Sequence, residues 1–82
     1  MHIVLTQQTH QSRQWSVLDG LKKYRVTCYW SGGDLRMNWL VEVYVMVAHG
    51  TSHWRQIKGR EVIGKVIEFS NASRSDAMSA NQ

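Results

Sequence analysis

The sequence predicts a mainly β fold: a small antiparallel sheet, or an SH3-like or OB-like barrel, of five to six short strands. Residues 37–48 (MNWLVEVYVMVA) place four valines at alternate positions, the spacing at which strand side chains share a face. Further β-type runs recur along the chain, and glycine-containing turns separate them. The chain has 82 residues, enough for one domain with a small core.

The N-terminal part is predicted to hold a short strand and a loop. The run His2–Thr6 is of β type, whereas residues 7–14 are predicted as a loop because none of their side chains is apolar. Asp19-Gly20, a little further on, is typical of a two-residue hairpin turn, since a type I′ turn needs positive φ at both central positions.

That turn would join two strands and pair Trp15 with Tyr24, an aromatic cross-strand pair. The alternative is a helix over Arg13–Lys23, with Trp15, Leu18 and Leu21 on one side. Because the Asp-Gly signal is strong, the hairpin is preferred.

The main hairpin is predicted around residues 31–34 (SGGD), the clearest turn in the chain. The strand Lys23–Trp30 precedes it, and residues 35–48 return from it. One face of the returning strand is apolar through Met37, Trp39 and the four valines. The other face carries Leu40, Glu42, Tyr44 and Met46. Because this second face is also partly apolar, we expect the chain itself or a partner to cover it.

Residues 49–51 and 58–59 are predicted turns on either side of a short strand at 52–57. Glu61–Phe69 is ambiguous, because valine and isoleucine pairs spaced by four would line a helix. Its four β-branched residues and Gly64 favour a strand, which is preferred.

The alternative fold is α+β: a four-stranded antiparallel sheet with one packed helix, over Arg13–Lys23 or Glu61–Ala72. Residues 71–82 are small and polar without periodicity, so the sequence predicts a β-rich domain at 1–70 and a flexible polar tail at 71–82.

Charge and cysteine content limit the functions that the chain can have. Ten Lys and Arg residues against six Asp and Glu give a net charge of +4, which favours anionic partners. The one cysteine, Cys28, rules out disulfides within a monomer and is predicted to be a buried thiol. The longest apolar run is short of a membrane span, and the N-terminus lacks signal-peptide character. We expect a cytoplasmic protein without a membrane partner.

No motif points to catalysis, a cofactor or a metal. His49 and His53 are four residues apart, but no further ligand accompanies them. A small metal-independent ribonuclease would use one of these histidines with Arg55 as acid and base. This reading ranks below a non-catalytic function, so the chain is not expected to be an enzyme.

The most informative pattern is a mixture of basic and aromatic residues. Trp30 and Trp39 are predicted mainly as core, whereas Tyr29, Trp54 and Arg55 are better candidates for exposed contacts. The candidate residues for binding a partner or nucleic acid are Lys23, Arg25, Tyr29, Arg36, Tyr44, Trp54 and Arg55.

Two functions fit these residues. The preferred one is a small regulator or inhibitor that covers a surface on a larger protein or protein–nucleic-acid complex, as phage and plasmid accessory proteins do. A homodimer, through Leu40, Tyr44 and Met46 or through an edge strand, is a variant of it. The alternative is a basic, aromatic nucleic-acid-binding domain.

Overall fold

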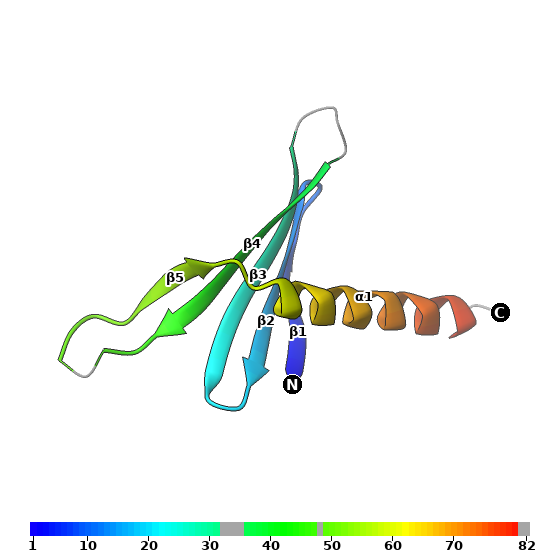
Figure 1. Ribbon diagram of the computed structural model, residues 1–82. Coiled ribbons are helices and arrows are strands. Elements are labelled where there is room, and N and C mark those ends of the chain that lie inside the picture. Colours follow the sequence, from blue (N-terminus) through cyan, green and yellow to red (C-terminus); the bar gives the residue numbers. More distant parts are fainter. Residues whose placement is uncertain (32–35, 48, 81–82) are drawn as a thin grey trace.

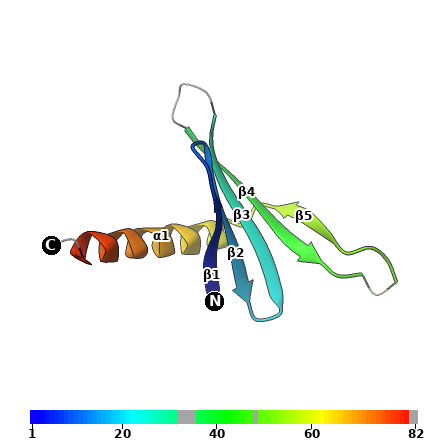
Figure 2. The same cartoon turned by 180° about the vertical axis from the view of Figure 1, so that it is seen from behind.

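The computed structural model describes residues 1–31, 36–47 and 49–80, with side chains except those of residues 31, 36, 37 and 73–80. The described elements form a five-stranded antiparallel sheet with a helix on one side of it (Figures 1 and 2). The elements are β1 (His2–Gln8), β2 (Ser12–Asp19), β3 (Lys22–Ser31), β4 (Arg36–Val45), β5 (His53–Ile57) and α1 (Arg60–Ala80).

Each strand pairs with the next one along the chain, in the order β1-β2-β3-β4-β5. This confirms the mainly β prediction in its form of a small antiparallel sheet. Because β1 and β5 are the two outer strands in this order, the described strands form an open sheet rather than a closed barrel. The added helix is the feature that the α+β alternative anticipated.

The hairpin between β2 and β3 confirms the preferred reading of this segment, although its register differs from the predicted one. Gly20 and Leu21 form the loop, with Gly20 at a φ of +61°, and Asp19 already pairs with Lys22. Trp15 therefore pairs with Val26 and not with Tyr24. A glycine at the first loop position supplies the positive φ of a primed turn, which moves the loop one residue onward. Because the partner of each β2 residue shifts by two residues along β3, every side chain stays on the predicted face of the sheet.

The polar segment 7–14, predicted as a loop, is strand over most of its length. The ladder of β1 and β2 pairs Gln7 with Gln14 and Gln8 with Arg13, after an irregularity that follows Leu5. Strand pairing joins backbone groups, so it does not require apolar side chains. The predicted turn at residues 31–34 falls partly outside the described residues, but the hairpin is confirmed by the pairing of β3 with β4.

The strand predicted over Glu61–Phe69 is wrong, because these residues lie in α1. Val62 and Val66 are one turn apart and both are buried against the sheet. Packing of this helical face outweighs the β propensity of the segment. No helix within the described residues is long and apolar enough to cross a membrane.

The start of α1 depends on Gly59. Its φ is +55°, and the Ile63 amide donates to the Gly59 carbonyl at 3.0 Å. A Cβ at this position would lie 2.5 Å from Cγ1 of Val41. Glycine therefore lets the chain turn closely over β4 and enter the helix. The helix continues to Ala80, through most of the residues predicted as a flexible tail, while the division at residue 70 stays a prediction.

The core lies between α1 and one face of the sheet. As predicted, Cys28 is buried there. Trp39 packs at the margin of this core and Trp30 is half-buried, whereas Trp15 is the tryptophan inside it. The buried side chains are Trp15, Val17, Tyr24, Val26, Cys28 and Val41 from the sheet, and Val62 and Val66 from the helix.

Candidate functional site: the open face of the sheet

The sheet face opposite α1 carries most of the candidate residues. Buried residues of β2, β3 and β4 point toward the helix, so the residues between them belong to the other face. In both views of the ribbon, α1 lies on one side of the sheet (Figures 1 and 2). We call the other side the open face, and its main residues are Val4, Leu18, Lys23, Arg25, Tyr29, Glu42, Tyr44 and Trp54.

The centre of the open face is a cluster of two aromatic rings and two cations from three strands. Trp54 of β5 pairs with Tyr44 of β4, and their ring centroids are 5.2 Å apart in an edge-to-face arrangement. The Arg25 Cζ, from β3, lies 4.4 Å from the Trp54 centroid. The Lys23 Nζ lies 5.9 Å from the Tyr44 centroid and 6.0 Å from that of Trp54. Trp54 thus reaches across β4 to residues of β3, and each cation gains from a ring face.

Glu42 fixes the position of Arg25 within this cluster. The Arg25 Nε and a terminal guanidinium nitrogen donate to the two carboxylate oxygens of Glu42, at 2.9 and 3.0 Å. The two residues are direct cross-strand neighbours. This two-point geometry holds the guanidinium against Trp54 and neutralises its charge. No carboxylate of the described side chains pairs with Lys23, so Lys23 supplies the positive charge at the centre.

Around the centre, apolar side chains remain exposed. Val4, Leu18, Tyr29 and Tyr44 are each about two-fifths exposed, at 44%, 44%, 41% and 37%. They come from four neighbouring strands on a face that no described element covers. A shallow pocket of about 170 Å³ lies beside Lys23, Arg25 and Trp54, and its lining surface is mainly apolar. A face of this composition is suited to contact with another molecule.

The structure brings together Lys23, Arg25, Tyr44 and Trp54, and it places Tyr29 on the same face, further along β3. Arg55 pairs with Val43, so it belongs to the side of the sheet that faces α1. Arg36 pairs with Ser31 at the end of the hairpin, and its side chain lies outside the described part of the structure.

Sequence reasoning placed Glu42 on the same face as Tyr44 but did not count it, Leu18 or Val4 among the candidate binding residues. Strand alternation could have placed Leu18 with Lys23, because a hairpin with a two-residue loop at Gly20 puts both side chains on the same face. The pairing of Glu42 with Arg25 needed the length of the loop between β3 and β4, which the turn residues do not fix.

The histidines are exposed and dispersed. The Nδ1 atom of His53 lies 3.4 Å from the Thr51 carbonyl oxygen, and His49 lies in the turn before β5. Among the described residues, no three His, Cys, Asp or Glu side chains gather in a way that could hold a metal.

Comparison with known proteins gives no match: no family model, no curated protein and no solved structure is similar to this chain.

Proposed function

We propose that this chain is a small, non-catalytic binding protein, a regulator or inhibitor whose open face covers a surface of a larger protein. The observation that carries the proposal is the cluster of Trp54, Tyr44, Arg25 and Lys23 on an uncovered sheet face. Tryptophan, tyrosine and arginine are the residues in which the binding energy of protein interfaces concentrates. The exposed valine, leucine and tyrosine side chains around the cluster extend the apolar area available for contact.

The internal contacts of the cluster favour a protein partner over nucleic acid. The guanidinium of Arg25 lies over one face of the Trp54 ring, where a stacking base would have to displace it. The carboxylate of Glu42 adds a negative charge where phosphates would approach. A partner surface with an apolar patch and a carboxylate opposite Lys23 matches the face without disrupting it. The net charge of +4 would steer such an acidic surface toward it.

We also propose that the protein acts in the cytoplasm and that it is an accessory protein of the phage or plasmid type. The buried, unpaired thiol of Cys28 supports a reducing compartment. The short single sheet supports the class, since a protein of this size acts by contact more readily than by an enclosed active site.

The test compares two adjacent residues on opposite faces of β5. The tagged chain, Trp54→Ala and Arg55→Ala are used as baits in host-cell lysate, each with and without nuclease. We expect the wild-type chain and Arg55→Ala to retain the same stoichiometric protein in the presence of nuclease, and Trp54→Ala to lose it. Equal capture by both variants, or a partner that nuclease removes, would contradict the proposal.

Nucleic-acid binding through the same face is the alternative. The observation that favours it is the charge of Lys23, which pairs with no carboxylate among the described side chains. A labelled single-stranded oligonucleotide tests it by anisotropy between about 50 and 200 mM salt. Steeply salt-dependent binding that Lys23→Ala weakens, with Arg55→Ala as the charge-matched control, would replace the first proposal. Cleavage of the oligonucleotide would instead support the ribonuclease reading.

A further inference from the structure

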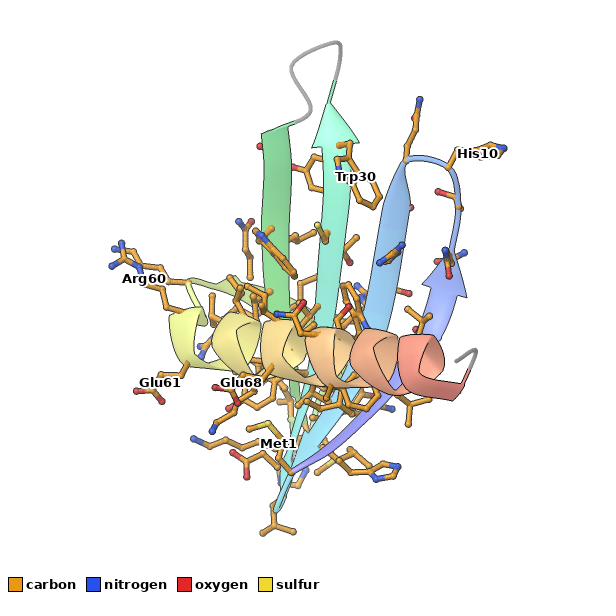
Figure 3. All side chains as sticks on the ribbon, turned by 90° about the vertical axis from the view of Figure 1, so that its right-hand side faces the viewer. Met1, His10, Trp30, Arg60, Glu61 and Glu68 are labelled. Atoms are coloured by element: carbon orange, nitrogen blue, oxygen red, sulfur yellow. The ribbon has the colours of Figure 1, made fainter. Side chains whose placement is uncertain are left out.

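A second candidate site lies on the other side of the sheet, in a cleft between α1 and strands β2, β3 and β4. The cleft has a volume of about 280 Å³. Ile67, Ser70 and Asn71 of α1 form one wall of it. Figure 3 looks onto this side and shows Trp30 next to β3, clear of the helix. The sheet side of the cleft is formed by Arg13, Trp15, Cys28, Trp30 and Trp39.

Among the described side chains, α1 packs against the core through Val62, Ile63, Val66 and Phe69, all in the first half of the helix. Val62 and Val66 are buried, whereas Ile67 is 40% exposed and Asn71 is exposed. Strands β2 and β3 continue past the helix, to the end where Trp30 lies. The helix therefore covers part of this face and leaves the end near Trp30 accessible (Figure 3).

Indole rings form the apolar surfaces of the cleft. Trp15 and Trp39 are stacked, with centroids 5.9 Å apart and planes inclined by 21°. Trp30 and Trp39 are half-buried, so parts of both rings remain available to a ligand. Flat apolar surfaces of this kind favour aromatic ligands, which gain from stacked and edge-to-face contacts.

Arg13 supplies a cation at the same place. Its Cζ lies 5.9 Å from the Trp30 centroid, and the ion pairs among the described side chains, Arg25–Glu42 and Lys65–Glu68, do not include it. The positive charge of Arg13 acts on Cys28, which also lines the cleft. Burial raises the pKa of the Cys28 thiol, and the charge of Arg13 opposes that rise. A half-buried guanidinium without a carboxylate is suited to bind an anionic group through two hydrogen bonds.

We propose that this cleft binds a small planar aromatic ligand that carries one anionic group, such as a carboxylate. The anionic group pairs with Arg13, and the ring system lies against the indoles. The volume is near the lower end for ligand sites, about 300 Å³, which limits the ligand to one or two fused rings. A neighbouring pocket also includes Arg13 and Trp15, together with Gln8 and Phe69, so Arg13 borders two adjacent hollows.

The distribution of the tryptophans provides the test. Trp15, Trp30 and Trp39 line the cleft, whereas Trp54 lies on the open face. The ¹⁵N-labelled chain of 82 residues is titrated with 2-naphthoate, and the indole Nε1–H signals are followed by NMR. We expect the signals of the three cleft tryptophans to shift and that of Trp54 to stay in place. The neutral 2-naphthalenemethanol and the non-aromatic cyclohexanecarboxylate should each bind more weakly than 2-naphthoate.

The contribution of Arg13 is tested with Arg13→Gln, and Arg55→Gln serves as the charge-matched control. We expect Arg13→Gln to weaken binding of 2-naphthoate by about tenfold or more and Arg55→Gln to leave it unchanged. If Arg13→Gln fails to fold, Asn71→Leu at the helix side of the cleft takes its place and should also weaken binding. Absence of shifts at millimolar naphthoate, equal movement of the Trp54 signal, or unchanged affinity in these cleft variants would overturn the proposal.

Discussion

The two faces of the sheet are held together by different forces, although the same strands supply both. On the covered face, Val17, Val26, Val41 and Val66 are almost completely removed from water. On the open face, a salt bridge and ring contacts join side chains that stay accessible. Because successive strand residues alternate between faces, stability and binding depend on adjacent positions and are separable by mutation.

The largest difference between the faces is expected when a tryptophan is removed from each. Trp15 is 4% exposed within the core, so Trp15→Ala should lower the free energy of unfolding by about 3–5 kcal/mol. Trp54 is half-buried and contacts Arg25 and Tyr44, so Trp54→Ala should cost about 1–2 kcal/mol. Urea unfolding followed by circular dichroism measures both. Equal losses would show that the open face also serves as core.

The next effect concerns the attachment of α1 to the covered face. Gly59→Ala forces a side chain into positive φ and against Val41, and we expect a loss of about 2 kcal/mol. Gly64→Ala is the matched control, since a Cβ there meets nothing within 4 Å. In mid-helix this change should raise stability by up to about 1 kcal/mol. Thermal unfolding of the two variants should therefore shift in opposite directions, and shifts in the same direction would contradict the geometry at Gly59.

A smaller effect is expected on the open face when its salt bridge is weakened. Glu42→Gln removes the negative partner of Arg25, whose side chain is 34% exposed, and should cost about 1 kcal/mol. The control is Glu68→Gln, because the Lys65–Glu68 pair is longer, at 3.9 Å, and more exposed. It should change stability by less than about 0.5 kcal/mol. If Glu42→Gln proves neutral by urea unfolding, the ion pair does not stabilise the fold.

The smallest effect is a pH dependence from Cys28. Burial raises the pKa of this thiol in the folded state, so above the ordinary thiol pKa the unfolded chain binds fewer protons than the folded one. Stability should then fall as the pH rises through this window. Cys28→Ala removes the contribution, and unfolding curves at pH 7 and at about pH 9.5 should diverge less for the variant than for the wild type. An identical pH response in both proteins would exclude a contribution of Cys28 to the pH dependence of stability.

The sequence predicted which side chains share a face of the sheet better than it predicted which residues pair between strands. Alternation placed Val26 and Cys28 on one side of β3, and the structure agrees. The pairing of Trp15 depended on whether the loop held Asp19-Gly20 or Gly20-Leu21, and both loops satisfy local turn chemistry. Only the packing of the complete sheet distinguishes them.

The helix was the less favoured of two readings for a related reason. Residues 61–69 carry β-branched side chains, and their helical conformation depends on burial of Val62 and Val66 against strands distant in sequence. For the candidate site, adjacency in sequence misled: Arg55 follows Trp54, and in a strand this places it on the opposite face. The cleft beside Arg13 arises from helix and sheet together, so no local pattern indicates it.

The order of pairing in the sheet has a consequence for how the chain folds. Every strand pairs with its successor, so most contacts are local and each hairpin can form as soon as its second strand is present. The helix follows all five strands, so during synthesis the apolar face remains exposed to water until α1 emerges. A chain interrupted before Arg60 would present that face to its neighbours, which makes the helix an internal protection against aggregation as well as a part of the core.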